Sequence, residues 1–308
     1  MMENNRIFNE DSIVGVQKIP ANSVHLILSD IPYGIGMDDW DVLHNNTNTA
    51  YLGTSPAQEK AGAIFKKRGK PLNGWSEADK QIPHQYYEWV RSWAPAWLNC
   101  LCPGGSVFVF AGRRFAHRCI VALEDSGFIF KDMLAWNKSH APLRAQRISQ
   151  VYMRRNDTIN EEKWQGWRVG NLAPVFEPIL WFTKPYKIGG TLADNIIQYE
   201  LGAYNQFAVE RYCGENGNII SMHGTKKDSG LHPTQKPEKL MAFLIELTTI
   251  KGQTVLDPFA GSGTTLVAAL KLKRQYIGFE KEKSYFDIAK KRLEEEEINL
   301  KSTLLPEV

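Results

Sequence analysis

The stretch Thr254-Val255-Leu256-Asp257-Pro258-Phe259-Ala260-Gly261-Ser262-Gly263-Thr264-Thr265 decides the fold. It begins as a short apolar strand and passes through an acidic, glycine-rich loop into a predicted helix over residues 266–272. A second strand, residues 275–279, follows and ends at Glu280. This order of strand, loop, helix and strand is the repeating unit of sheets that contain parallel strands. The sequence therefore predicts an α/β fold with a ligand site at the carboxyl ends of its strands.

The loop in this stretch has the chemistry of a nucleoside site that holds no phosphate. Glycines at 261 and 263 let backbone N–H groups approach a ligand, and Glu280 can accept hydrogen bonds from two ribose hydroxyls. A pyrophosphate loop needs glycine where Leu266 stands, which argues against a nucleotide-dependent oxidoreductase, and a P-loop needs lysine after Gly263. Asp257 would repel phosphate but suits an ammonium or a sulfonium. The residues favour S-adenosylmethionine over NAD or ATP, and the alternative is a tight turn without a ligand.

A second acid-tipped strand lies near the start of the chain. The apolar run at 24–28 ends in Ser29-Asp30-Ile31-Pro32-Tyr33-Gly34. Asp30 supplies a carboxylate, and Pro32 favours an extended Ile31 whose carbonyl can point outward. Tyr33 supplies a flat face on which a planar group can stack. Two acceptors beside an aromatic plane suit the exocyclic amine of a flipped nucleobase, and the alternative is a plain Asp-x-Pro turn.

Between these two stretches, strands alternate with helices, as in a doubly wound sheet. The segment at 77–101 repeats its apolar residues at three- and four-residue steps, which predicts a helix. Pro103-Gly104-Gly105 is expected to break the chain before the next strand. The remaining predicted strands are 106–111, 128–136 and 176–183, and the remaining predicted helices are 12–19, 113–126, 237–248 and 281–300.

Three segments lack this periodicity and are predicted as inserts in one catalytic domain, residues 1–308. The loop at 34–75 carries a basic cluster at 66–70, so it is either a flap that meets nucleic acid or a solvated loop. The insert at 139–172 interleaves arginines with Tyr152, Trp164 and Trp167, which suits phosphates and stacked bases. A basic segment that packs on the sheet is the alternative. Either this insert or the one at 186–231 could read a nucleic-acid sequence.

Composition sets broad limits on the class of protein. The chain has 308 residues, a net charge of +3 and 43% hydrophobic residues, as expected of a globular protein with a sizeable core. Its four cysteines form no Cys-x-x-Cys pair, so we expect reduced thiols, a cytoplasmic location and no metal site. No run is long and apolar enough to span a membrane. Cys102 precedes Pro103 in a turn, and we interpret it as structural and not as a nucleophile.

Several motifs together resemble the beta group of DNA amino-methyltransferases, which methylate adenine N6 or cytosine N4. Asp30-Ile31-Pro32-Tyr33 resembles the Asp-Pro-Pro-Tyr signature of that family, with Ile31 in place of its first proline. The loop that starts at Asp257 resembles the cofactor loop, and it is the more specific of the two matches. The segments 232–237 and 176–182 resemble two further family motifs, and the order of the motifs is that of the beta group.

The resemblance implies a fold and a set of site residues. The fold would be a circularly ordered, Rossmann-like methyltransferase: a mixed, mainly parallel seven-stranded sheet with helices on both faces. In that arrangement the strand tips that carry Asp30 and Asp257 are neighbours. The implied catalytic residues are Asp30, Ile31, Pro32 and Tyr33. The implied ligands of S-adenosyl-L-methionine are Asp257, Pro258, Phe259, Gly261, Ser262, Gly263, Thr264, Glu280 and Lys236.

The resemblance also implies a function. A site-specific methyltransferase of a restriction-modification system would act on double-stranded DNA in the cytoplasm of a prokaryote or a phage-infected host. Adenine N6 is the preferred target, because aspartate at the head of the motif accompanies adenine in this family and serine accompanies cytosine N4. Cytosine N4 methylation and a catalytically silent, DNA-binding regulatory protein stay open as alternatives. A cognate restriction endonuclease and a homodimer stay open as partners.

Overall fold

The computed structural model describes residues 4–33, 77–138, 141, 145–186, 189–214, 217–224 and 235–303. The loop at 34–75, with its basic cluster, therefore lies outside the described residues. So do residues 232–234 of the motif that ends at Pro237.

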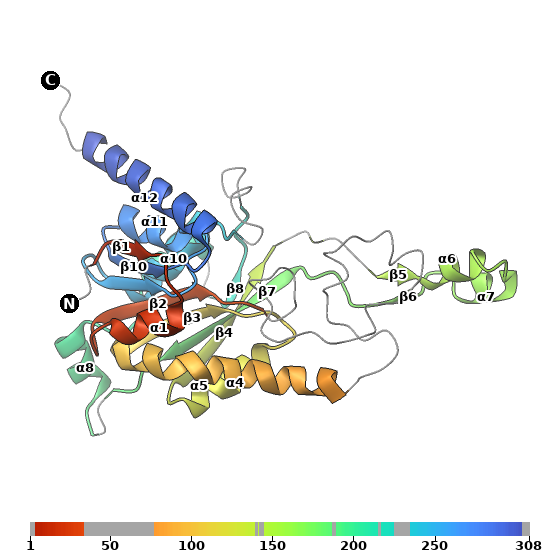
Figure 1. Cartoon of the computed structure of the whole chain (residues 1–308), viewed down its shortest axis with the longest axis horizontal. Helices are drawn as coiled ribbons and strands as arrows, with labels where there is room; N and C mark the ends of the chain where they lie inside the picture. Colours follow the sequence, from red (N-terminus) through yellow and green to blue (C-terminus); the bar gives the residue numbers. More distant parts are fainter. Residues whose placement is uncertain are drawn as a thin grey trace.

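A sheet of eight strands forms the centre of the molecule (Figure 1). Strand β7 runs antiparallel to its neighbours β3 and β4, and the other pairings are parallel. The predicted fold class is confirmed, and a two-residue edge strand, β8, brings the seven expected strands to eight. In spatial order the strands are β1 (Arg6–Phe8), β10 (Gln275–Phe279), β9 (Thr254–Asp257), β2 (Val24–Asp30), β3 (Leu101–Phe110), β7 (Phe176–Thr183), β4 (Ile129–Asn137) and β8 (Ile219–Ile220).

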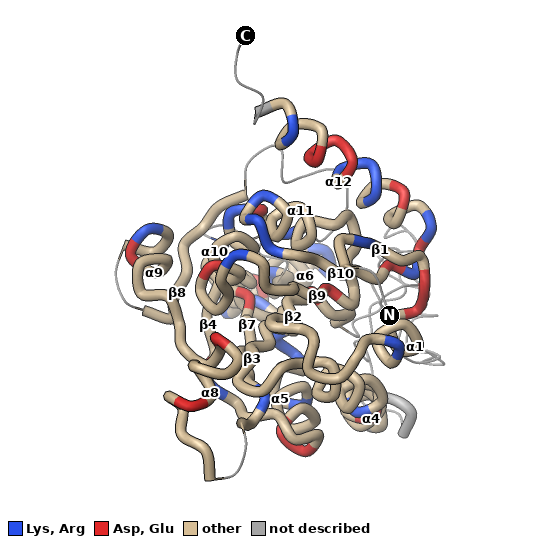
Figure 2. The backbone as a smooth tube through the Cα atoms, turned by 90° about the vertical axis from the view of Figure 1, so that its left-hand side faces the viewer, with Lys and Arg blue, Asp and Glu red and all other residues tan. Residues whose placement is uncertain are grey.

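Helices cover both faces of this sheet, as Figure 2 shows from one end. Successive residues of a strand point to opposite faces, so β2 sends Ile27 into one core cluster and Leu26 and Leu28 into the other. The first cluster is closed by α4 (Glu77–Cys100) and α5 (Ala116–Asp125), and the second by α10 (Glu238–Thr248) and α11 (Thr264–Lys271). The long helix α12 (Lys283–Thr303) packs on α11.

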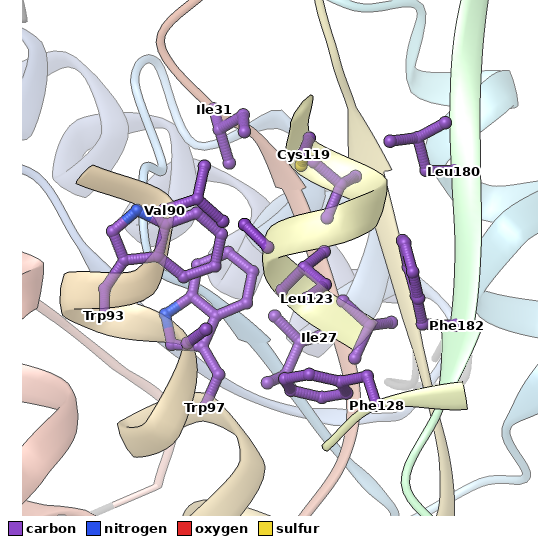
Figure 3. Close-up of a cluster of buried hydrophobic side chains, with 14 of the residues drawn as sticks. Ile27, Ile31, Val90, Trp93, Trp97, Cys119, Leu123, Phe128, Leu180 and Phe182 are labelled. Atoms are coloured by element: carbon purple, nitrogen blue, oxygen red, sulfur yellow. The ribbon is translucent and has the colours of Figure 1, made fainter. Parts of the chain in front are cut away.

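The first core cluster is rich in aromatic side chains (Figure 3). Trp93 and Trp97 of α4 lie with ring centroids 4.0 Å apart and are both fully buried. Burying side chains of this size contributes about 2–3 kcal/mol each. Ile31 is also buried in this cluster and is labelled in the close-up of Figure 3. The side chain that departs from the family signature is therefore part of the core.

Strand β3 begins five residues earlier than predicted, at Leu101, and runs through the Pro103-Gly104-Gly105 sequence that was expected to break the chain. The reason is pairing on both sides. Leu101 already pairs with Val24 of β2, and a register shift follows in that ladder. Gly104 donates its N–H to the carbonyl of Lys184, and Lys184 donates back to Gly105. The glycines are thus held in the sheet by their neighbours, against their own weak strand propensity.

The two later inserts contain regular elements that the sequence did not predict. Residues 146–169 form an arm of β5 (Gln146–Arg147), α6 (Ile148–Met153), α7 (Thr158–Lys163) and β6 (Arg168–Val169), which projects beyond the sheet (Figure 1). The third insert contains α8 (Leu192–Tyr199) and α9 (Gln206–Cys213). These helices are too short for a period to be recognised, and their signal lies in their caps. Thr191 and Asp194 form a capping box at α8, and Asn205 caps α9.

The first segment of the chain contains α1 (Ser12–Gly15) and the 3₁₀ turn η1 (Val16–Lys18), close to the helix predicted at 12–19. None of the described helices is both long enough and apolar enough to cross a membrane.

Candidate active site

Strands β2 and β9 pair side by side, with Leu26 opposite Val255 and Ile27 opposite Leu256. Because the strands are parallel, their carboxyl ends meet at one edge of the sheet. Asp30 and Asp257 therefore both line the same cavity, whose volume is about 400 Å³. The structure thus brings together the two acid-tipped stretches from opposite ends of the sequence.

Most of the residues singled out from the sequence line this cavity, and a few stand beside it. Ile31, Tyr33 and Gly263 contribute no lining surface. The lining also includes residues that the sequence analysis did not single out, among them Asp11, Ser12, Trp89 and Gln235. The expected residues that do line it are Asp30, Pro32, Lys236, Asp257, Pro258, Phe259, Gly261, Ser262, Thr264 and Glu280.

The glycine-rich loop is shaped by hydrogen bonds to two carboxylates. Asp257, which is 3% exposed, accepts from the Ser29 hydroxyl at 2.7 Å and from the backbone N–H of Phe259 at 3.1 Å. Glu280 accepts from the N–H of Gly261 at 2.8 Å. Burial raises the pKa of Asp257 to about 6, and burial also raises the pKa of Glu280. Both groups therefore carry their negative charge at a cost that a cationic ligand would offset.

Two backbone features complete the loop. Gly261 and Gly263 have φ of 51° and 79°, in the left-handed region that favours glycine. A Cβ at Gly263 would lie 2.8 Å from the Cβ of Ala289 on α12, so close packing requires glycine there as well. Arg292 of the same helix donates to the carbonyl of Ser262. Helix α12 thus holds the loop from behind.

Gln235 lines the cavity with a buried amide whose Nε2 and Oε1 both lack a hydrogen-bond partner within the described chain. Buried polar atoms are almost always bonded, so an amide with both ends free is typical of a site that receives a ligand. This fits a polar small molecule in the cavity.

At the β2 side of the cavity, four ionisable side chains form a cluster, of which Asp30 and Lys236 line the cavity: Asp30, Tyr33, Glu177 and Lys236. The Lys236 ammonium lies 2.5 Å from Asp30 Oδ2 and 3.1 Å from Glu177 Oε1. The Tyr33 hydroxyl lies 2.9 Å from Asp30 Oδ1, is also bonded to Glu177, and accepts from Lys236 at 3.2 Å. Lys138, at the end of β4, pairs with the other oxygen of Glu177.

The two carboxyls of this cluster differ in their environment. Burial raises the pKa of Asp30 above its ordinary value, and the charge of Lys236 offsets this only in part. Burial would also raise the pKa of Glu177, but Lys236 and Lys138 outweigh it and lower that pKa to about 2. Glu177 is therefore the permanent anion, and Asp30 is the group that can take a proton.

Lys236 was expected at the cofactor. Its side chain lines the cavity, and its ammonium also bonds to Asp30. The sequence did not lead us to expect Glu177 or Lys138 as site residues. A signal for Glu177 was present, because it is a single acid in the otherwise buried, apolar strand Phe176–Thr183. Cys102 donates its thiol to the carbonyl of Asn22, and burial raises its pKa to about 11, in keeping with the structural role predicted for it.

Comparison with known proteins agrees with this geometry. A family model described as DNA methylase, covering N6 and N4 methylation, matches residues 24–291. The chain is 58% identical to the type II methyltransferase M.HindIII of Haemophilus influenzae, over 93% of this chain and 94% of that protein. PvuII DNA methyltransferase, a cytosine-N4-specific enzyme, has the same fold, with a TM-score of 0.62 at 17% identity and coverage of 97% and 92% of the two chains. A second solved structure, the complex of M1.HpyAVI with S-adenosylmethionine, has a TM-score of 0.51 at 22% identity, with 94% and 98% covered. The chain therefore belongs to the DNA methylase family, enzymes that transfer a methyl group from S-adenosylmethionine to DNA.

Proposed function

We propose that this DNA methyltransferase acts on the exocyclic amine of a base that has swung out of the duplex, and that adenine N6 is its preferred target. The observation that carries the proposal is the meeting of two acid-tipped strands, β2 and β9, at one cavity. One strand end would hold the methyl donor, and the other would hold the amine that receives the methyl group.

The β9 side has the residues that S-adenosyl-L-methionine requires. Asp257 and Glu280 receive hydrogen bonds from hydroxyl and backbone N–H groups, which favour their charged forms against the burial that raises both pKa values. A ligand with a ribose, an ammonium and a sulfonium suits such a surface better than one with phosphates. When bound, the cofactor supplies an electrophilic methyl group. Asp257, Glu280, Lys236 and the loop residues 258–264 are the proposed binding residues.

The β2 side has the residues that would position the amine. In the proposed mechanism, Asp30 and the carbonyl of Ile31 accept hydrogen bonds from the two amine hydrogens, which draws the nitrogen lone pair out of conjugation with the ring. Pro32 restricts the backbone at this point. In this proposal the base would stack on the ring of Tyr33, which stands beside the cavity and is kept in place by its bonded hydroxyl. Positioning supplies much of the acceleration, and Asp30 stabilises the positive charge that develops on nitrogen.

The choice of adenine rests on the aspartate at the head of Asp30-Ile31-Pro32-Tyr33. The test is to incubate the protein with labelled cofactor and unmethylated duplex DNA, digest the DNA and identify the labelled base. We expect N6-methyladenine. Label in N4-methylcytosine would reverse the preference, and no label in any base would favour the catalytically silent alternative. The intact Asp30 cluster counts against that alternative.

The arm at 146–169 is the proposed surface for DNA. It exposes five basic side chains, and Trp167, 62% exposed, lies against Trp164 with ring centroids 5.7 Å apart. Guanidinium and ammonium groups neutralise phosphates, and aromatic rings can stack on bases. The basic residues are Arg147, Arg154, Arg155, Lys163 and Arg168. Mapping methylated bases in a host that expresses the protein, with and without the arm substituted, tests whether the arm sets the recognition sequence.

Two further partners are proposed. The type II name of the relative from Haemophilus influenzae supports a cognate restriction endonuclease that recognises the same site. A homodimer in the cytoplasm is the second proposal, and sedimentation at several protein concentrations, with and without DNA, tests it.

A further inference from the structure

We propose that Glu177 is a positioning residue for methyl transfer: by holding Lys236 and Tyr33 in place, it controls how much of the Asp30 carboxylate is free to receive the target amine. This inference rests on the proposed role of Asp30. Glu177 does not itself line the cavity, so its influence has to pass through these two side chains.

Glu177 is a buried acid in an apolar part of the fold. It is 5% exposed near the start of β7, where the neighbouring residues of the strand are apolar. A buried carboxylate is costly unless it is paired, and packing alone would be better served by an apolar side chain. Glu177 has three partners from three other parts of the chain: Tyr33 after β2, Lys138 after β4 and Lys236 before α10.

Lys236 is shared between two carboxylates. Its ammonium lies 2.5 Å from Asp30 and 3.1 Å from Glu177, and it is itself 6% exposed. If Glu177 were neutral, the buried ammonium would have Asp30 as its one remaining anion in the cluster. The Asp30 carboxylate would then be bound more tightly by lysine and would be a poorer acceptor for the amine of a base. Glu177 thus keeps part of the lysine charge away from Asp30.

The hydroxyl of Tyr33 has a single proton and lies between the carboxylates of Asp30 and Glu177. Its ring packs against the backbone at Gly112, where an added Cβ would lie 2.9 Å from the Tyr33 Cβ. The ring is therefore held at its base by close packing and at its tip by Glu177. A ring fixed at both ends is suited to receive a flipped base in one orientation.

Methyl transfer also releases a proton, which the cluster has to accept. When the amine nitrogen forms its bond to the methyl group, the methyl–sulfur bond breaks and its electron pair stays on sulfur. The nitrogen then has one proton too many. That N–H bond breaks, the proton goes to the Asp30 carboxylate, and from there to solvent after product release. Glu177, paired with two lysines, stays an anion throughout and keeps Lys236 charged.

The charges that face Asp30 decide the sign of the pH effect. Glu177 of β7 and Asp257 of β9 oppose the ionisation of Asp30, Lys236 favours it, and Lys138 acts on Glu177. The Tyr33 hydroxyl lies between Asp30 and Glu177 and favours the ionisation of whichever carboxylate receives its single proton. Removing the Glu177 charge should therefore lower the pKa of Asp30, whereas removing the Lys236 charge should raise it. A residue that only maintains the fold would not give opposite shifts.

The experiment measures single-turnover methylation of duplex DNA at saturating cofactor from pH 5 to pH 9, for wild type, E177Q, E177D and K236Q. We expect E177Q to lower the plateau of the pH–rate profile at least tenfold. The acidic limb of that profile, where the rate falls as Asp30 is protonated, should move to lower pH. K236Q should move that limb to higher pH. E177D, which keeps the charge, should keep the wild-type limb with a reduced plateau.

The control is E246Q on α10, because Glu246 is a partly buried acid, with a side chain 13% exposed, that pairs with Arg211 at 3.0 Å and does not line the cavity. It should leave the plateau and the limb unchanged. Cofactor affinity by calorimetry serves as the test of folding, and if E177Q fails to bind cofactor, the pair E177D and K236Q decides the question. The proposal would be overturned if the acidic limbs of E177Q and K236Q moved in the same direction, or if the pH–rate profile of E177Q were the same as that of wild type. Absence of any methylated base with wild type would instead refute the proposed target chemistry.

Discussion

The hydroxyl of Ser29 donates a hydrogen bond of 2.7 Å to the buried carboxylate of Asp257, across 228 positions of sequence. Ser29 directly precedes Asp30, and Asp257 opens the glycine-rich loop. This single bond therefore ties the proposed base side of the cavity to the proposed cofactor side. It also acts on a carboxylate whose pKa burial raises to about 6.

Asp257→Asn should stabilise the cofactor-free protein while weakening cofactor binding. The pKa of Asp257 is 3.8 in an unfolded chain and about 6 here, so the folded state binds more protons between these values. Stability from this group therefore falls as pH rises from about 4 to about 6, by at most about 3 kcal/mol. Asparagine carries no charge at any pH and can still accept from Ser29. Urea unfolding at pH 5 and pH 7.5 should show a gain of about 1–2 kcal/mol that is larger at pH 7.5.

The companion measurement is cofactor binding by calorimetry at pH 7.5, where Asp257→Asn should lose at least tenfold in affinity because the cationic ligand loses its counter-charge. Unfolding that is easier than wild type at both pH values would mean that the charge itself supports the fold, contrary to this account.

Asp30→Ala should abolish turnover and leave cofactor affinity within about threefold of wild type. Loss of a group that stabilises developing charge or takes a proton lowers rates by about 10²–10⁴. The fold should tolerate the change, because Lys236 retains Glu177 as a partner at 3.1 Å. Rates are measured by transfer of labelled methyl to DNA, and affinity by calorimetry. Asp287→Ala, at an exposed acid of α12, is the control. Equal losses of affinity and turnover would move Asp30 out of the catalytic role.

Sequence reasoning went furthest where chemistry and periodicity coincide. The bounds of β7 and β10 were predicted to the residue, because each is an apolar run with clear ends. These bounds depend on local patterns that survive folding unchanged. The shared cavity was predicted from the family resemblance, whose circular order makes the two acid-tipped strands neighbours.

What escaped prediction depends on contacts between distant segments. The partners of Lys236 come from strands at other places in the sheet, so its adjacent motif pointed to the cofactor and not to Asp30. The early start of β3 depends on pairing with Lys184, and no local signal marks it. In the arm, the helices α6 and α7 have six residues each, which is less than two turns and too short to show a period.

Gly263→Ala should destabilise the protein more than Gly252→Ala does. Both glycines have a left-handed backbone, with φ of 79° and 85°. Alanine at either position costs about 1 kcal/mol for that conformation. At Gly263 the new methyl would also lie 2.8 Å from Ala289, whereas nothing lies within 4 Å at Gly252. We expect a difference of about 1–3 kcal/mol between the two variants in urea unfolding. Equal losses would show that α12 can move away from the loop without cost.

Substituting two arginines of the arm should change how DNA binding depends on salt. Arg154 and Arg155 are exposed after α6, where the arm projects beyond the sheet (Figure 1). Each phosphate contact releases condensed counterions, so log Kd varies with log salt in proportion to the number of contacts. We expect the double variant R154A/R155A to reduce that slope by about 2 in fluorescence anisotropy with duplex DNA. The matched control is K290A/K291A, which removes the same charge from exposed positions of α12. If both double variants reduced the slope equally, the effect would reflect net charge, and the arm would lose its special role in DNA binding.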